Sequence, residues 1–400
     1  MRSFQMLFWV VFLVIYTLIT IGAVENIIQL VIFRLKSKIR IISYLLFVAL
    51  IFALVLLYIW PGDVRTSDNY SMYYIFNGIL LIDFFIKIPL SFFYILGLLF
   101  SNKYKRSIIN WIGLIISGSI FMIMLYGNIF GRNDLAVQKI ELKFPNLPQE
   151  FNEFRIVQIS DIHLGSFIGS QKVLKKVYNL TELIKPDLIV FTGDFVNNFS
   201  NELNNWDKIF QGINKQGNSY SILGNHDYGN YSSWKNEVEK TNNFQAITDA
   251  HSKFGFQLLR NENKLITNGS DSIYLIGVEN WGHPPFPQYA ELDSAMIGVP
   301  KDAFKILLSH DPAHWESQIN GKQNIALTLS GHTHGLQLGF VKAGIPFSLS
   351  YLVRKNWGGL YKSDDTYLYV NTGLGTVGIP FRIDMPAELT VITLKRIKVD

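Results

Sequence analysis

The stretch Ser330-Gly331-His332-Thr333-His334-Gly335 directly follows the apolar run Ile325–Leu329. The run predicts a buried strand. Side chains alternate along extended backbone, so two histidines separated by one residue at its end point the same way. The flanking glycines leave room for a group to approach the backbone closely. A pair of this kind predicts a metal site only if other parts of the chain supply further ligands.

Four other predicted strands end in residues of the same kind. Short apolar runs that predict buried strands occur at Arg155–Ser160, Leu188–Thr192, Ser219–Leu223 and Lys305–Ser309. They are followed by Asp161 and His163, by Gly193-Asp194, by Gly224-Asn225-His226-Asp227 and by His310-Asp311. Predicted helices at Gln171–Ile184 and around Trp206–Ile213 alternate with the strands, an arrangement that brings strand ends to one rim, where α/β folds bind ligands. One such pair suits an ordinary turn, but five strand ends predict a shared metal site.

Composition limits the chemistry of that site. The chain contains no cysteine, which excludes disulfides, thiolate metal sites and a cysteine nucleophile. Any metal must therefore be held by His, Asp, Glu or Asn. Up to Phe130 there are ten basic and four acidic residues, whereas the rest of the chain has 26 and 27. Because this second part has no basic excess, we expect no nucleic-acid binding.

The residues before Gly131 predict a membrane module. Four apolar segments have about the length of roughly 20 residues that crosses a bilayer. They are Phe4–Phe33, Ile41–Trp60, Met72–Phe100 and Ile108–Phe130. The first is too long for a cleavable signal peptide, and no small-residue cleavage site follows it. We therefore expect about four transmembrane helices in residues 1–130 and a connector at 131–150 that leads into a strand at Val137–Leu142.

The charges between these segments predict an orientation. Four basic residues lie between Arg34 and Arg40 and three between Lys103 and Arg106, whereas the loop Pro61–Tyr70 carries one Arg and two Asp. Basic loops remain in the cytoplasm. A multi-pass cell membrane protein with both termini and the C-terminal domain outside the cytoplasm is therefore expected.

Asp83 and Lys87 lie one helical turn apart inside the third apolar segment. Charged residues inside a membrane are candidates for function, and this spacing lets the two side chains pair. A structural ion pair within the helical bundle is the favoured interpretation.

Read together, the five strand ends resemble a known family. Asp161-x-His163, Gly193-Asp194, Gly224-Asn225-His226-Asp227, His310 and Gly331-His332-Thr333-His334 resemble, in order and spacing, the signature of the calcineurin-like metallophosphoesterases. Ser309–Pro312, Asn371–Gly375 and Pro386–Glu388 are similar to the bacterial YaeI/YkuE-type phosphodiesterase branch. The resemblance covers Phe151 to Lys395, with a departure at Leu336, where this branch often has glycine. It implies an α/β domain at residues 151–400, built as a two-sheet β-sandwich flanked by helices.

The resemblance also implies roles for these residues. Two metal ions about 3.5–4 Å apart would hydrolyse a phosphate ester by attack of a bridging hydroxide. One ion would be held by Asp161, His163, Asp194 and His334, and the other by Asp194, Asn225, His310 and His332, with Asp194 as the bridge. His226 would contact the scissile phosphate, and Asp227 would orient His226. Ligands of this mixed type suit Mn, Fe or Zn and do not distinguish among them.

Three histidines and one arginine remain outside these motifs. His251 and His314 are interpreted as helix-surface residues, and His283 as a packed loop residue, with a place at the substrate entrance as the alternative. Arg382 suits either a structural ion pair or a contact to phosphate.

The predicted function is a membrane-anchored, dimetal-dependent phosphoesterase, with phosphodiester hydrolysis favoured. Its location makes a lipid-linked phosphate ester at the bilayer a candidate substrate. The first alternative is a UDP-2,3-diacylglucosamine pyrophosphatase of lipid A synthesis, whose nucleotide substrate is cytoplasmic. The second is a non-catalytic membrane receptor that binds a ligand through the same domain.

Overall fold

The computed structural model describes residues 2–31, 70–215, 217–282, 287–340, 347–352 and 354–397. These residues fall into two compact units: 2–31 and 72–126 belong to the first, and Tyr70, Ser71 and the residues from Gly127 onward belong to the second. The predicted segment Ile41–Trp60, the charged loops on either side of it and His283 lie outside the described residues.

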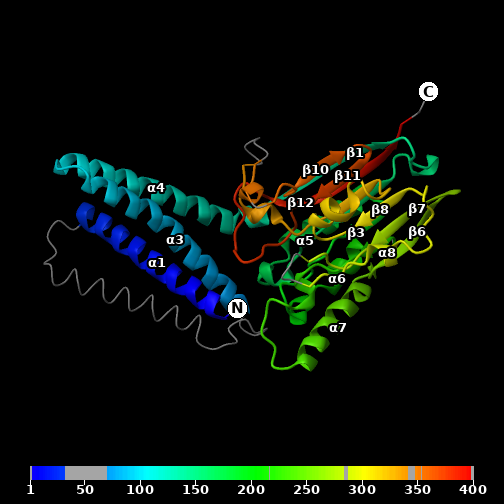
Figure 1. Cartoon of the computed structure of the whole chain (residues 1–400), viewed down its shortest axis with the longest axis horizontal. Helices are drawn as coiled ribbons and strands as arrows, with labels where there is room; N and C mark the ends of the chain where they lie inside the picture. Colours follow the sequence, from blue (N-terminus) through cyan, green and yellow to red (C-terminus); the bar gives the residue numbers. More distant parts are fainter. Residues whose placement is uncertain are drawn as a thin grey trace. The chain divides into compact units, whose positions relative to one another are not determined.

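The first unit consists of the long apolar helices α1 (Arg2–Val31), α3 (Tyr70–Leu98) and most of α4 (Lys103–Ile129), shown in blue to cyan in Figure 1. They correspond to three of the four predicted segments. Among the described residues, α3 and the span Lys103–Asn133 are long and apolar enough to cross a membrane, and α1 contains a shorter apolar stretch, Val14–Leu30. The described residues thus contain two candidate membrane-spanning helices.

The predicted pairing of Asp83 with Lys87 is confirmed. The Lys87 Nζ atom lies 2.5 Å from Asp83 Oδ2, and the Tyr16 hydroxyl of α1 donates a hydrogen bond to the same carboxylate. Because Lys87 is buried, this carboxylate compensates a charge that would otherwise be costly to keep away from water. The hydrogen bond from Tyr16 to Asp83 joins α1 to α3 inside the unit.

The second unit is an α/β domain with two mixed sheets. The first sheet has the strand order β1 (Leu135–Phe144), β12 (Ala387–Arg396), β2 (Arg155–Ile159), β3 (Leu188–Phe191), β4 (Ser219–Ser221) and β5 (Gln257–Leu258). The second has the order β10 (Gly359–Ser363), β11 (Thr366–Val370), β9 (Leu327–Ser330), β8 (Lys305–Leu308), β7 (Asp271–Gly277) and β6 (Glu262–Asn268).

Three apolar clusters hold the layers of this domain together. Strands β3, β8 and β9 are buried at every residue, as expected when both faces of a sheet are covered. Between the sheets, residues such as Val190 and Leu308 form a shared core. The outer face of the first sheet packs against helices α5 (Lys172–Ile184), α6 (Asp207–Ile213) and α7 (Glu237–Lys253), which Figure 1 draws in green. The outer face of the second sheet packs against α8 (Leu292–Ala295) and the turn Trp315–Ile319.

This topology brings the predicted strand ends together. Strands β2, β3 and β4 are parallel neighbours in the first sheet, and β8 and β9 are parallel neighbours in the second. Their carboxyl ends therefore open at the same end of the sandwich. The two sheets also join there, because the backbone N–H of His332 donates to the Asp161 carboxylate at 2.9 Å.

The predicted strand Val137–Leu142 lies within the longer strand β1. β1 pairs in parallel with β12 along its whole length, from Leu135 opposite Ala387 to Phe144 opposite Arg396. The segment that follows the last apolar helix is therefore an integral edge strand of the first sheet.

Candidate metal centre

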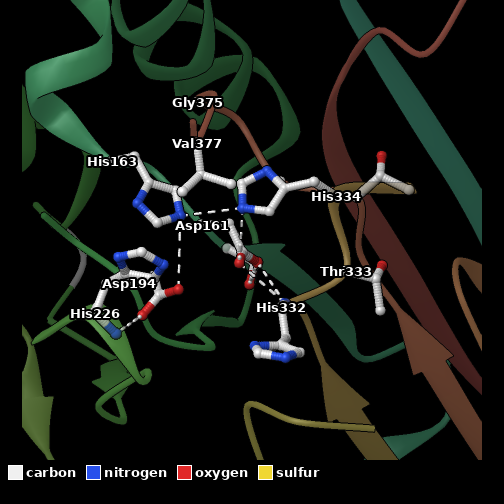
Figure 2. A network of polar contacts seen from close by, with 12 residues as sticks. Asp161, His163, Asp194, His226, His332, Thr333, His334, Gly375 and Val377 are labelled. Carbon is white, nitrogen blue, oxygen red and sulfur yellow. Dashed lines mark hydrogen bonds and ion pairs between the residues drawn. The ribbon is translucent and has the colours of Figure 1, made fainter. Parts of the chain in front are cut away.

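The seven residues expected to bind metal converge where the strands end. Two groups have ligand atoms close enough to hold an ion, Asp161 with His163 and His334, and Asp161 with Asp194 and His310. Asn225 and His332 adjoin the second group, because Asn225 Oδ1 lies 3.0 Å from His310 Nε2 and 2.7 Å from His332 Nδ1. Figure 2 shows His163, His334, Asp161 and Asp194 around one space, with Thr333 on the far side of its loop.

The ring nitrogens of His163 and His334 face each other. Their Nε2 atoms are 3.0 Å apart, and the His163 Nε2 atom is also 3.5 Å from Asp194 Oδ2. The His334 Nε2 atom lies 3.3 Å from Asp161 Oδ1. Two imidazoles and two carboxylates thus point at one location, which is the donor set that divalent transition metals prefer.

The hydrogen-bond partners of the rings suit metal binding. His163 Nδ1 lies 3.1 Å from the Val196 carbonyl, and His310 Nδ1 lies 2.7 Å from the Thr192 carbonyl. A carbonyl can only accept, so each Nδ1 carries the hydrogen and each Nε2 is turned toward the site. Histidine ligands of metals are commonly fixed in this way by a carbonyl behind the ring. The residues present therefore fit a metal centre.

The carboxylates dominate the electrostatics of the site. Asp161 and Asp194 are both buried. Burial alone would lower the pKa of His310, but the Asp194 carboxylate, 3.1 Å from its Nε2 atom, raises it to about 10. Burial alone would raise the pKa of Asp194. The neighbouring His310 and His226 outweigh this and hold its pKa well below the usual range. Without metal the site thus keeps a proton on His310 at the position where a cation would bind.

Backbone strain is concentrated in the same residues. Five of the seven expected ligands have φ in the left-handed region, namely Asp161 (48°), His163 (44°), Asp194 (64°), His332 (75°) and His334 (51°). Such a conformation costs a non-glycine residue about 1–3 kcal/mol and persists only where the surroundings enforce it. The surrounding structure therefore holds these residues in a strained backbone conformation that directs their side chains toward the site.

Glycine is required at two positions by close approach. A Cβ on Gly331 would lie 2.1 Å from Asp161 Oδ2. Gly193 has a φ of 97°, and a Cβ there would lie 2.6 Å from the backbone nitrogen of Gly224. Both glycines let neighbouring strand ends pack against the carboxylates.

His226 lies beside this group. Its backbone N–H donates to Asp194 Oδ1 at 2.9 Å, and its ring meets the His163 ring edge-on at 4.9 Å between centroids. The Nδ1 atom donates to the Asn197 carbonyl at 2.7 Å, so Nε2 is the atom left for a substrate.

Asp227 has a different position from the one expected. Its carboxylate was predicted to orient His226, but it accepts the backbone N–H groups of Asp194 and Gly224, each at 2.9 Å, and that of Phe195 at 2.9 Å. The physical reason is that these amides, at the ends of β3 and β4, need buried acceptors. Asp227 thus fixes the loop that carries Asp194, while the Asn197 carbonyl orients the His226 ring.

Two further residues at the site carry no motif signal. The Tyr231 ring stacks on His226 with 4.4 Å between centroids, and its hydroxyl accepts a hydrogen bond from Asn225 Nδ2 at 2.8 Å. Arg354 donates to Asp311 at 2.8 Å, and Asp311 lies 3.8 Å from His332 Nε2. Both residues are on irregular loops, where neither periodicity nor spacing predicts a position.

The residues left outside the motifs are mostly structural. His251 and His314 were predicted on helix surfaces, and this is wrong, because both are fully buried. The Ser221 hydroxyl lies 2.7 Å from His251 Nδ1, and the Ser309 hydroxyl lies 2.8 Å from His314 Nδ1. Arg382 is buried, and its guanidinium donates to the carbonyls of Thr372, Gly373, Gly375, Met385 and Pro386. It thereby holds the loop after β11, whose Gly375 N–H donates to the Asp161 carbonyl at 2.8 Å.

Comparisons with known proteins agree with this site. The family model described as calcineurin-like phosphoesterase matches residues 154–336. A Bacillus subtilis protein named uncharacterized metallophosphoesterase YkuE is 31% identical over 270 residues, which are 64% of this chain and 83% of that protein. An uncharacterized metallophosphoesterase of Aquifex aeolicus is 30% identical over 268 residues, 65% of this chain and 92% of the relative.

Another similar protein is named as a transmembrane protein. A zebrafish (Danio rerio) protein named transmembrane protein with metallophosphoesterase domain is 29% identical over 279 residues, 69% of this chain. The match covers 61% of the zebrafish protein, so this chain spans less than two thirds of that relative's length.

Proposed function

Because this chain belongs to the calcineurin-like metallophosphoesterases, we propose that it is a membrane-anchored phosphoesterase that uses two metal ions, with a phosphodiester as the favoured substrate. In this proposal residues 1–130 form the anchor, 131–150 connect it to the catalytic part, and 151–400 form the metallophosphoesterase domain. Two divalent ions, when bound, would neutralise charge on the phosphoryl oxygens and lower the pKa of a water between them.

The position of Asp194 carries the two-ion assignment. Its Oδ2 atom lies 3.5 Å from a ring nitrogen of His163 and 3.1 Å from a ring nitrogen of His310. A carboxylate between two imidazoles from different strand ends is suited to bridge two cations. We assign Asp161, His163, Asp194 and His334 to one ion, and Asp194, Asn225, His310 and His332 to the other. Mn, Fe and Zn suit these nitrogen and oxygen donors, and Mg suits them least.

The remaining polar residues act on the substrate or on the ligands. With Nδ1 donating to the Asn197 carbonyl, His226 can present Nε2 to the scissile phosphate, where it stabilises charge or gives a proton to the leaving oxygen. Asp227, by accepting the amides around Asp194, keeps the bridging carboxylate in position. It is a positioning residue in this scheme.

Turnover and metal content of the full-length protein test this proposal together. Protein reconstituted with Mn should hydrolyse bis-p-nitrophenyl phosphate, and Asp194→Asn should lose nearly all turnover together with bound metal. Asp293→Asn, an exposed carboxylate on α8, is the matched control and should retain both. Wild-type protein that binds two metal ions but turns over none of a panel of phosphoesters would be a ligand-binding receptor instead.

The side of the membrane on which the domain lies decides between the enzyme alternatives. We propose, from the basic loops of the helical module, that both termini and the catalytic domain are extracytoplasmic and that the substrate is a lipid-linked phosphoester of the bilayer. An alkaline phosphatase reporter, which is active only outside the cytoplasm, should be active when fused after Asp400. An inactive reporter would favour the cytoplasmic pyrophosphatase of UDP-2,3-diacylglucosamine.

A further inference from the structure

Four large apolar side chains are exposed next to the metal ligand His334. They are Leu336 (45% exposed), Phe340 (53%), Tyr351 (58%) and Leu352 (76%), and we call them the apolar rim. Single exposed apolar residues are normal on a protein surface. Four that share one small region are not, and such a patch usually marks a binding surface.

Hydrogen bonds show that the rim is one local structure rather than scattered residues. The Ser348 hydroxyl shares its hydrogen between the carbonyls of Gly335 and Leu338, and the backbone of Gly339 forms an antiparallel β-bridge with Ser348. The Phe340 N–H donates to the Phe347 carbonyl at 2.9 Å, and the Tyr351 N–H donates to the Ser348 carbonyl at 3.1 Å. Ser348 therefore ties the segment that follows His334 to the turn that carries Tyr351 and Leu352.

The same region is tied to the last turn of α4. The Asn128 side chain donates to the Pro380 carbonyl at 2.7 Å, and the Arg382 N–H donates to the Gly127 carbonyl at 3.3 Å. Ile383, the residue after Arg382, forms a parallel β-bridge with Leu338. The Gly339 N–H donates to the Ile383 carbonyl at 3.0 Å. All of these residues belong to the second unit. Two short links thus connect the helix end to the rim.

The sequence of α4 identifies the level of the membrane surface at this point. The helix is apolar as far as Phe130, and Gly131-Arg132-Asn133-Asp134 follow. Ile129 and Phe130 are themselves exposed. A membrane helix leaves the hydrocarbon where its apolar run gives way to polar residues. Residues linked to Gly127 and Asn128 therefore lie near the lipid headgroups.

We propose that the apolar rim is a bilayer-contact surface, which sets the metal centre against the headgroup region so that the phosphate of a membrane lipid can reach it. This inference rests on the proposed function for its substrate, a lipid phosphoester, but not for the contact itself. Insertion of apolar side chains beside the site would bring a headgroup phosphate to the ligands without extracting the lipid from the membrane.

Fluorescence quenching by lipids tests the contact without reference to activity. The chain has no cysteine, so a single substitution gives a single labelling site in the full-length protein. Phe340→Cys and Leu352→Cys would carry an environment-sensitive fluorophore in nanodiscs of dioleoylphosphatidylcholine, with or without a lipid bearing a doxyl quencher near the headgroup. Leu183→Cys and Ile297→Cys are matched controls, because those residues are 78% and 75% exposed but lie outside the rim.

We expect the doxyl lipid to quench both rim labels at least threefold more strongly than the two control labels. Equal quenching at all four positions would overturn the proposal. The proposal would also be overturned if the rim labels were shielded from aqueous iodide but were not quenched by the doxyl lipid. A protein surface would then cover the rim. Gel filtration and the thermal unfolding of each labelled variant show whether it is folded, and Tyr351→Cys replaces a variant that is not. If no form of the protein turns over any phosphoester, the proposed function fails while the quenching result still decides the contact.

Discussion

His163 and His334 point their Nε2 atoms at each other across 3.0 Å. The hydrogen of the His163 ring is on Nδ1, where the Val196 carbonyl accepts it, so a lone pair of His163 faces the other ring. In the metal-free site a hydrogen on His334 Nε2 can bridge the two nitrogens, and a bound cation would take over that bridging position and use both rings as ligands.

Removing metal should therefore destabilise the domain. A ligand present at 100 times its dissociation constant stabilises the folded state by about 2.7 kcal/mol, which corresponds to roughly 5–10 °C in Tm for a domain of this size. We expect chelation followed by gel filtration to lower Tm by about that amount and Mn to restore it, as measured by differential scanning fluorimetry. A chelated protein with unchanged Tm would mean that these residues are stable without an ion.

Metal affinity should rise with pH. Because the pKa of His310 is about 10 in the metal-free site, its imidazolium must lose a proton before Nε2 can bind an ion. Below that pH, one released proton makes the affinity increase about tenfold per pH unit. Titration calorimetry in two buffers of different ionisation enthalpy would count the protons, and a count of zero at pH 7.5 would contradict the expectation.

Tyr231 should position two functional residues. Its hydroxyl accepts from Asn225 Nδ2, so that Oδ1 is turned toward His310 and His332. Tyr231→Phe removes the hydroxyl and should weaken metal binding about tenfold, the lower end of the effect of outer contacts on ligands. Tyr231→Leu also removes the stacking on His226 and should lower kcat further. Tyr274→Phe on β7 is the control, and equal metal affinity in all three variants would exclude this role.

Arg354 should support His332 through Asp311. The ion pair at 2.8 Å keeps a buried carboxylate charged within 3.8 Å of His332 Nε2, and loss of such a support costs about 10–100-fold in metal affinity. We expect Arg354→Met to show this loss in metal titrations at constant pH. Lys355→Met changes the charge of an exposed neighbour and should leave the affinity within twofold. If both variants behave alike, the effect is one of net charge.

Replacing Leu336 with glycine should stabilise the folded protein. Its φ is 49°, and a left-handed conformation costs a residue with a side chain roughly 1–2 kcal/mol. Leu336→Gly should therefore raise the free energy of unfolding by about 1 kcal/mol, whereas Leu183→Gly in helix α5 should lower it by about the same amount. Denaturant titration measures both. The exposed Leu336 side chain, held at this strained position, belongs to the apolar rim.

The strand-end motifs allowed us to predict the α/β architecture and the convergence of the ligands. Both predictions rest on local sequence patterns. Apolar runs identify buried strands, and a polar residue directly after a run is fixed by the same backbone. Tyr231 and Arg354 could not be found in this way, since each meets its partners through the path of a loop.

The misassigned histidines show a second limit of sequence patterns. Helix α7 is polar over most of its length, so periodicity does not identify its inner face. His251 is buried there because the Ser221 hydroxyl pairs with its Nδ1 atom and Phe195 packs against its ring with 4.7 Å between centroids. Both partners come from distant parts of the chain, which a local pattern does not contain.

The pairing of β1 with β12 has a consequence for biosynthesis. β1 is made directly after the candidate membrane helix α4, and its partner strand β12 leaves the ribosome about 250 residues later. Until then β1 has no neighbour in the sheet, and Gly375, which holds the Asp161 carbonyl, has only just been synthesised. In the proposed function, insertion of the candidate membrane helix α4 would therefore precede closure of the domain, and a metal ion would be bound only after β12 has paired with β1.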